Sequence, residues 1–106
     1  MKLYLAVALG LAFLAAPGAF AQISTGNIYG TVHDAQGAVL PGVTVTLSGE
    51  LGTRTTVTSP QGDFRFLGLD RGTYTVSLAL TGFANVKRDV VVTTGENVNL
   101  ELSMAV

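Results

Sequence analysis

Residues 30–47, GTVHDAQGAVLPGVTVTL, carry most of the information that this chain gives about its fold. Apolar and polar residues alternate over 28–32 and again over 43–47. Alternation at a period of two places side chains on opposite faces and predicts two half-buried β-strands. Between them, Gly37 and the Leu40-Pro41-Gly42 segment mark the turns of a connecting loop.

The same alternation continues to the C-terminus, with turn residues at the spacing of about eight to twelve that is typical of all-β domains. After residue 21, no stretch has apolar residues at helical spacing. Two sheets packed face to face require interior alternation on every strand. The pattern therefore predicts an all-β fold, a seven-stranded β-sandwich with strands over 27–34, 43–48, 53–59, 63–67, 73–80, 85–93 and 97–103.

Two of these strands have the composition of sheet edges. Residues 53–59 are rich in threonine, and Val57 is their only clear candidate for the core. Residues 85–93 carry Arg88 in phase with apolar neighbours such as Val90. An inward-facing charge is one device by which edge strands avoid pairing with other chains. We therefore predict that both strands lie at sheet edges.

The first 21 residues have the form of a helical signal peptide. Lys2 precedes an apolar stretch, residues 3–16, and Ala19-Phe20-Ala21 has the small-x-small pattern of a signal-peptidase site. We expect cleavage between Ala21 and Gln22.

An uncleaved membrane anchor is the alternative, because no charge interrupts residues 3–21. Pro17-Gly18 argues against it, since this pair ends the apolar helix before the ~20 residues that a membrane span needs. The chain is thus predicted to comprise a signal peptide (1–21), a flexible lead-in (22–26) and one β-sandwich domain (27–103).

Composition excludes several classes of function. The chain has six basic and seven acidic residues, and removal of the leader with Lys2 leaves five minus seven, a net charge of −2. No basic patch is present to bind a phosphate backbone, which argues against nucleic acid as a partner. Cysteine is absent, so disulfides, thiolate metal sites and a cysteine nucleophile are all excluded.

The sequence offers no convincing catalytic set. His33 is the only histidine, and Asp34 follows it directly. Neighbouring residues of a strand point to opposite faces, so Asp34 is poorly placed to orient the imidazole for a serine nucleophile. The G-x-S-x-G segment of many hydrolases does not occur. We therefore predict no catalytic residues and no enzyme, with His33 a solvated side chain of its strand.

Asp34, Asp63 and Asp70 leave calcium binding open, because each lies near a turn and calcium prefers several carboxylate oxygens. No D-x-D-x-D run fixes their spacing, however, and aspartates in turns commonly accept hydrogen bonds from their own backbone. We therefore predict no metal and no cofactor. Lys87, the only lysine beyond the leader, lies out of phase with the core, which argues against an internal isopeptide bond.

Carbohydrate binding is an alternative that rests on the aromatic residues. Sugar sites commonly stack a sugar ring on an exposed aromatic face, and this chain has no tryptophan. Phe64, Phe66 and Tyr74 lie in core phase. Tyr29 and Phe83 remain as the candidate ligand-facing residues.

Three segments carry a distinctive pattern of turn and core residues. Gly30 to Leu47 reads G-x-V-x-D-x-x-G-x-x-L-P-G-V-x-V-x-L, Thr58 to Leu69 reads T-x-x-x-G-x-F-x-F-x-x-L, and Gly72 to Val76 reads G-T-Y-T-V. Together they resemble the carboxypeptidase regulatory-like domain, over about 28–102. The resemblance implies a seven-stranded, transthyretin-like sandwich. Such domains occur behind signal peptides at the N-termini of TonB-dependent outer-membrane receptors, and as accessory modules of exported enzymes and adhesins.

The leader and the resemblance together imply an exported protein of the periplasm, outer membrane or medium. We expect a non-catalytic structural or interaction module, either the N-terminal extension of a TonB-dependent receptor or a free-standing relative, with a carbohydrate-binding module as the alternative. The expected partner is a protein at the cell envelope, or a glycan under the alternative. We expect contact with a membrane only through a larger parent protein or an uncleaved signal. Docking by strand addition to 53–59 or 85–93 is the expected mechanism.

Overall fold

A computed structural model describes residues 25–106, and within them it contains seven strands and no helix. The expected signal peptide and its cleavage site, Ala21 and Gln22, lie outside the described residues. No helix in the described range is therefore long and apolar enough to cross a membrane. The strands are β1 (Thr25–Asp34), β2 (Thr44–Gly49), β3 (Gly52–Val57), β4 (Asp63–Asp70), β5 (Gly72–Ala79), β6 (Val86–Val92) and β7 (Asn97–Met104).

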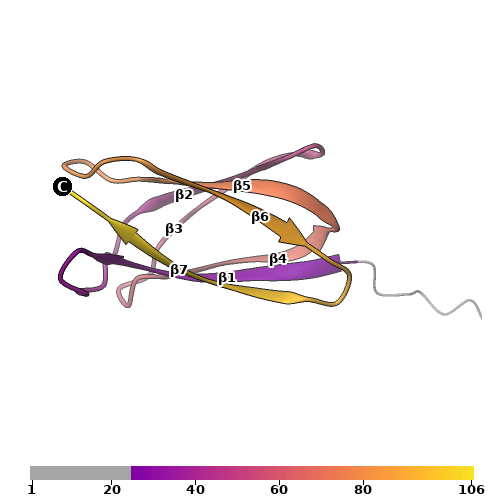
Figure 1. The fold of residues 1–106 in the computed structure, drawn as a ribbon, viewed down its shortest axis with the longest axis horizontal. Helices are drawn as coiled ribbons and strands as arrows, with labels where there is room; N and C mark the ends of the chain where they lie inside the picture. Colours follow the sequence, from indigo (N-terminus) through magenta and orange to yellow (C-terminus); the bar gives the residue numbers. More distant parts are fainter. Residues whose placement is uncertain (1–24) are drawn as a thin grey trace, which may run out of the picture.

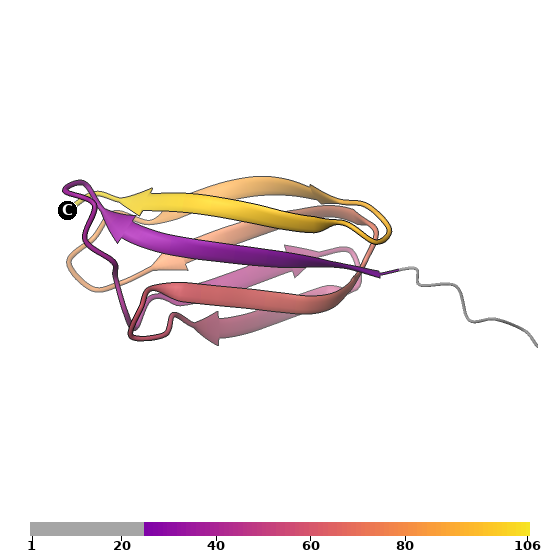
Figure 2. The ribbon, with the colours of Figure 1, turned by 90° about the horizontal axis from the view of Figure 1, so that it is seen from below.

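The strands lie in two layers (Figure 1). The smaller sheet has the order β4-β1-β7 and faces the viewer in Figure 2, and the larger sheet has the order β3-β2-β5-β6. β1 and β7 are parallel, whereas β1 and β4 and the three pairs of the larger sheet are antiparallel. The seven-stranded β-sandwich predicted from the sequence is confirmed.

The core lies between the two sheets and follows the predicted alternation. In β2, Val45 and Leu47 are buried, whereas Thr44 is exposed. Phe64 and Phe66 of β4 enter the same core and meet edge to face, with ring centroids 6.0 Å apart. Because each large apolar side chain contributes about 1.5–3 kcal/mol when buried, this core holds the sheets together without disulfides. Its buried members are Ile28, Val32, Val43, Val45, Leu47, Phe64, Phe66, Leu69, Val76, Leu78, Val90, Val92, Leu102 and Met104.

β1 begins earlier than the sequence suggested. Thr25 and Gly26 belong to the strand rather than to the expected lead-in, 22–26. The Thr25 carbonyl accepts a hydrogen bond from the Gly95 N–H at 2.9 Å. At Gly26 there is no room for a side chain, because a Cβ would lie 2.6 Å from Cγ1 of Val92. This glycine therefore permits a close approach of β1 to β6 instead of marking a turn.

Val57 lies on the opposite face from the one predicted. It is 57% exposed, because it pairs with Thr44 on the outer face of the larger sheet. The inward positions of β3 belong to Arg54 and Thr56, which pair with buried residues of β2. The register with β2 decides the face, and it outweighs the gain from burying a single valine.

β3 and β6 are the two edges of the larger sheet, as predicted. Arg88 of β6 pairs with the buried Val76, so it lies on the inward face of the sheet. It stays exposed because no strand of the sandwich lies beyond β6 among the described residues. The predicted inward-facing charge at a sheet edge is confirmed.

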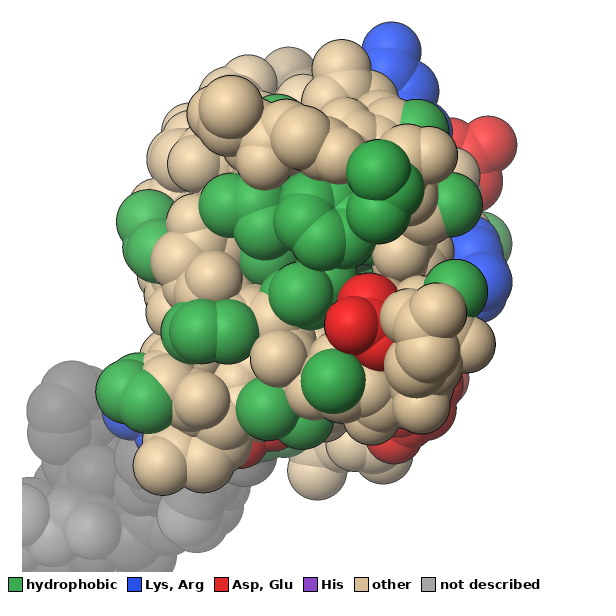
Figure 3. Space-filling model, turned by 90° about the vertical axis from the view of Figure 1, so that its left-hand side faces the viewer, with side chains coloured by type: hydrophobic (Ala, Val, Ile, Leu, Met, Phe, Trp, Pro, Cys, Tyr) green, Lys and Arg blue, Asp and Glu red, His purple; other side chains and the backbone are tan. Residues whose placement is uncertain are grey.

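Apolar side chains gather at one end of the sandwich, which holds the β1–β2 loop, the β5–β6 loop and the C-terminus (Figures 1 and 3). A hydrogen bond of 2.7 Å from the Ala84 N–H to the Ala105 carbonyl joins the second loop to the end of the chain. Val39 and Val106 are 47% and 97% exposed. We call this surface the apolar end.

Candidate functional site

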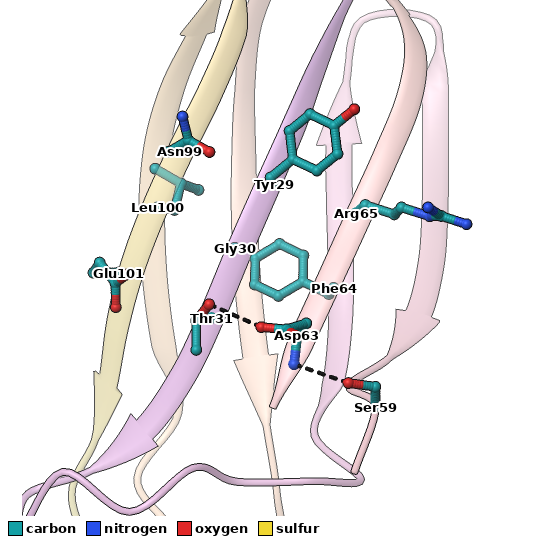
Figure 4. Close-up of a pocket in the computed structure, with 10 residues that line it drawn as sticks. All are labelled: Tyr29, Gly30, Thr31, Ser59, Asp63, Phe64, Arg65, Asn99, Leu100 and Glu101. Atoms are coloured by element: carbon teal, nitrogen blue, oxygen red, sulfur yellow. Dashed lines mark hydrogen bonds between the residues drawn. The ribbon is translucent and has the colours of Figure 1, made fainter. Parts of the chain in front are cut away.

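A trough crosses the outer face of the smaller sheet (Figure 4). It has a volume of about 550 Å³ and is open to solvent. Every strand of the sheet contributes to it, with one further residue from the β3–β4 turn. Its lining residues are Tyr29, Gly30, Thr31, Ser59, Asp63, Phe64, Arg65, Asn99, Leu100 and Glu101.

Strand register divides this lining into two walls and a floor. Tyr29 is opposite Asn99 of β7 and Arg65 of β4, and these three form one wall, the Tyr29 row. Two residues further along β1, a second row forms the other wall, with Glu101, Thr31 and Asp63 in register. The backbone of the row between them, Leu100, Gly30 and Phe64, forms the floor.

The floor contains a close contact between Gly30 and Phe64. A Cβ at Gly30 would lie 2.1 Å from Cζ of Phe64, so the phenyl ring occupies the place of the missing side chain. The Phe64 side chain is buried in the core. β1, which carries the trough, is also the central strand of its sheet.

The polar side chains of the second wall, on Glu101, Thr31 and Asp63, contact other residues of the domain. Thr31 Oγ1 donates to Asp63 Oδ1 at 3.0 Å, and the Asp63 N–H donates to Ser59 Oγ at 3.2 Å (Figure 4). Glu101 Oε2 lies 3.3 Å from Nε2 of His33, which occupies the next outward position of β1. Thr31 thus bonds the Asp63 carboxylate, whereas the Glu101 carboxylate is exposed and contacts only His33 among the described residues.

The polar groups of the Tyr29 row, in contrast, have no bonding partner among the described residues. Among residues 25–106, the side chains of Tyr29, Arg65 and Asn99 make no hydrogen bond or ion pair with another residue. The next row of the same face is bonded internally, since Asn27 donates to Asn97 at 2.9 Å and accepts from the Gly68 N–H at 3.0 Å. The free polar groups of this face are thus concentrated around a half-exposed aromatic ring.

The two residues predicted to face a ligand lie in different places. Tyr29 is 36% exposed at the centre of one wall of the trough. Phe83 lies in the β5–β6 loop and is half-buried against the core, at the apolar end. The sequence reading missed Arg65 and Asn99. The alternation of the sequence places both residues on the outward faces of strands 63–67 and 97–103. It does not indicate that these two strands flank β1.

The three aspartates weighed as calcium ligands do not meet. Asp34 Oδ1 accepts from the N–H groups of Gln36 and Ala38 at 2.9 and 3.0 Å, as expected for an aspartate in a turn. Asp70 pairs with Thr25, at the opposite end of β1. In residues 25–106, no three His, Cys, Asp or Glu side chains come close enough to hold a metal ion.

His33 and Asp34 do not form a catalytic pair either. The bonds from Gln36 and Ala38 hold the Asp34 carboxylate in its own turn, while the His33 imidazole approaches Glu101. Nδ1 of His33 is buried and has no hydrogen-bond partner among the described residues. His33 is therefore only partly solvated, with 30% of its side chain exposed.

A second candidate surface is the free side of β3. The Thr58 N–H donates to the Val43 carbonyl at 3.0 Å, and Val43 is opposite Thr58 in the continuing register of β2 and β3. Hydrogen-bonded pairs alternate along an antiparallel ladder, so Thr56 and Arg54 also face β2. Their neighbours point their N–H and C=O groups away from the sheet. We call these backbone groups, at Thr53, Thr55 and Val57, the β3 edge.

The sequence and the fold agree with one family. The profile of the carboxypeptidase regulatory-like domain matches residues 27–105. The chain belongs to this family. The resemblance seen in the three sequence segments is thereby confirmed. No curated protein matches the chain in sequence.

Several solved structures are similar to this regulatory-like domain. Part of the Bacillus anthracis TIE protein matches with a TM-score of 0.70 and 26% identity, over 77% of this chain and 16% of that one. GBS52, the minor pilin of Streptococcus agalactiae, matches with a TM-score of 0.65 and 18% identity, over 79% and 45%. A proposed carbohydrate-binding protein from Pseudomonas aeruginosa matches with a TM-score of 0.62 and 19% identity, over 84% and 97%. The regulatory-like domain thus spans less than half the length of the first two proteins.

Proposed function

We propose that this chain is an exported, non-catalytic interaction module of the cell envelope that docks a protein partner on the β3 edge. It serves as the N-terminal extension of a TonB-dependent receptor or as a free-standing relative. The leader supports export, and a minor pilin of the same fold supports a place at the cell surface. The exposed apolar end is also typical of contact with another protein or domain.

The observation that carries this proposal is the outward-facing backbone of Thr53, Thr55 and Val57. An extended segment of a partner adds to such an edge through main-chain hydrogen bonds. All residues of β3 except Thr56 are exposed, so nothing within the described sandwich covers the strand.

β3 suits strand addition better than β6, the other edge of the larger sheet. β6 carries three consecutive charged residues, Lys87, Arg88 and Asp89, which oppose pairing with another chain. β3 has one charged residue, Arg54, whose Nη1 donates to the Leu67 carbonyl of β4 at 2.7 Å. That bond directs the guanidinium toward the smaller sheet, so the Arg54 charge does not oppose pairing at the free side of β3.

Site-specific crosslinking in the native host tests the docking surface. A photo-reactive residue at position 53 should crosslink one partner, and the added substitution Thr55→Pro should remove the product. Proline at 55 deletes an outward N–H but no bond to β2, so the strand itself is retained. The same photo-reactive residue at Thr75, in β5, is the control. A crosslink that persists with Thr55→Pro contradicts docking by strand addition.

Fractionation tests the context of the module. An antibody raised to residues 22–106 should detect either a much larger band in the outer membrane or a band of domain size in the periplasm or medium. The first result identifies the extension of a receptor, and the second a free-standing module. A band confined to the cytoplasm contradicts export.

Carbohydrate binding is the second candidate, and it involves a different face of the molecule. Its supporting observation is the half-exposed Tyr29 between the unbonded side chains of Arg65 and Asn99. A protein of the same fold is described as a proposed carbohydrate-binding protein. Retention of the chain on immobilised polysaccharides, screened by affinity electrophoresis, tests this function. Unretarded migration on every polysaccharide contradicts it.

A further inference from the structure

We infer that the trough binds a neutral oligosaccharide laid across the three strands of the smaller sheet, with the Tyr29 row as its principal contact. This inference rests on the second candidate function and specifies its site, ligand class and direction of binding. It depends on three features of the trough. They are the unbonded polar groups of one wall, the hydrogen-bond acceptors of the other wall and the open ends.

The Tyr29 row offers groups that the fold itself does not use. The Arg65 guanidinium has five N–H donors, and the Asn99 carboxamide donates and accepts. Between them lies the Tyr29 ring, an amphipathic surface with an apolar face and a hydroxyl. A sugar ring has the matching character, with C–H groups on its faces and hydroxyl groups around its rim.

The opposite wall supplies hydrogen-bond acceptors. The Asp63 carboxylate is bonded by Thr31, the Glu101 carboxylate contacts His33, and both carboxylates accept bonds from hydroxyl donors. The two walls are two residues apart along each strand, which is about 7 Å at the backbone. A sugar hydroxyl both donates and accepts, so one ring can donate to this wall while it accepts from Arg65 and Asn99.

The direction of the ligand follows from the sheet topology. Both walls run from β7 through β1 to β4, across the strands (Figure 4). β7 and β4 are the outer strands of this sheet, so no further strand closes the trough at either end. An open-ended trough admits the interior of a chain as well as its terminus, which favours an oligosaccharide over a single sugar.

The charges of the lining favour a neutral ligand. The lining carries one cation, Arg65, and two carboxylates, Asp63 and Glu101, and the Arg65 side chain extends outward from β4 (Figure 4). A uronic acid or a sulfated sugar would add a further negative charge to a lining in which carboxylates outnumber cations. Like charges repel, so acidic glycans should bind more weakly than neutral ones.

Titration calorimetry with defined hexasaccharides tests the inference on the purified 106-residue chain. The neutral probes are maltohexaose, cellohexaose and mannohexaose, and the acidic probe is hexagalacturonate. At least one neutral probe should bind, and Tyr29→Ala should weaken it by about tenfold or more. Arg65→Ala and Asn99→Ala should each weaken it several-fold. Tyr29→Phe keeps the ring and should retain most of the affinity.

Thr46→Ala, on the outer face of the larger sheet, is the matched control and should bind like the wild type. Thermal melts of every variant separate loss of the site from loss of the fold. If no hexasaccharide binds, the carbohydrate-binding function itself fails, and the inference fails with it. If a neutral probe binds but Tyr29→Ala has no effect, the function stands and the assignment to the trough is wrong. If hexagalacturonate binds more tightly than the neutral probes, the ligand class is wrong.

Discussion

The ring of Phe64 occupies the side-chain position of Gly30, its partner across the β1–β4 ladder. A Cβ at Gly30 would lie 2.1 and 2.3 Å from Cζ and Cε1 of the ring, well inside van der Waals contact. This relationship explains a glycine in the middle of a central strand, where its flexibility would otherwise be a cost. It also couples the core, which Phe64 fills, to the floor of the trough on the other side of the sheet.

Gly30→Ala should therefore strongly destabilise the domain. The added methyl group must displace a buried phenyl ring, and overpacking of this kind costs about 3 kcal/mol. Urea denaturation measures the loss, and Gly30→Ala with Phe64→Leu should recover part of it relative to Gly30→Ala alone. If Gly30→Ala were as stable as the wild type, the close contact would not exist in solution.

Thr58 is a buried polar residue whose hydroxyl joins two segments. Its Oγ1 donates to the Leu40 carbonyl at 2.7 Å and accepts from the Val43 N–H at 2.9 Å. Thr58→Val keeps the shape but leaves both backbone groups without this partner, so stability should fall by about 2 kcal/mol. Thr44→Val, at an exposed position of β2, should change it by less than about 0.5 kcal/mol. Equal effects of the two substitutions would show that the Thr58 hydroxyl is unimportant.

The two tyrosines of the described domain should respond differently to loss of the hydroxyl. Tyr74 Oη donates to the Asp70 carbonyl at 2.6 Å, whereas the Tyr29 hydroxyl has no partner among residues 25–106. Tyr74→Phe should therefore lose about 1 kcal/mol of stability, and Tyr29→Phe close to none. Chemical denaturation of the two variants side by side measures both. A larger loss for Tyr29→Phe would contradict the assigned bond.

His33→Val should stabilise the domain slightly. The substitution removes a buried Nδ1 that has no partner in the described residues and places a β-branched residue near the end of β1. The exposed contact with Glu101 that it also removes contributes less than about 1 kcal/mol. We expect a net gain of about 0.5 kcal/mol in the free energy of unfolding. A loss greater than 1 kcal/mol would mean that Nδ1 is bonded in solution, most simply to water.

The strands could be predicted because each carries its own signal. Every predicted strand overlaps an observed one, from 27–34 against Thr25–Asp34 to 97–103 against Asn97–Met104. The face of a strand was also predictable wherever several apolar residues share one phase, as in Val43, Val45 and Leu47. The prediction of the face was wrong for Val57, because this valine is the only apolar side chain of β3. Pairing with β2 decides which face of β3 points inward.

The trough could be anticipated only in part. Tyr29 was identifiable because it is an aromatic residue in the outward phase of its strand. Its neighbours Arg65 and Asn99 are 36 and 70 positions away in the sequence, and no local pattern relates them to it. The parallel pairing of β1 with β7 brings Asn99 beside Tyr29, and the antiparallel pairing with β4 brings Arg65 to the other side.

By itself, the sequence determined the strands, the turns, the all-β class and the family, because periodicity and turn chemistry are local properties of the chain. Only the tertiary structure decided which strands are neighbours, and thereby which outward side chains form one surface. That choice depends on burying the apolar faces of both sheets together, a gain that belongs to the whole core and to no single strand. The β3 edge and the trough are products of this packing, so neither could be read from the sequence alone.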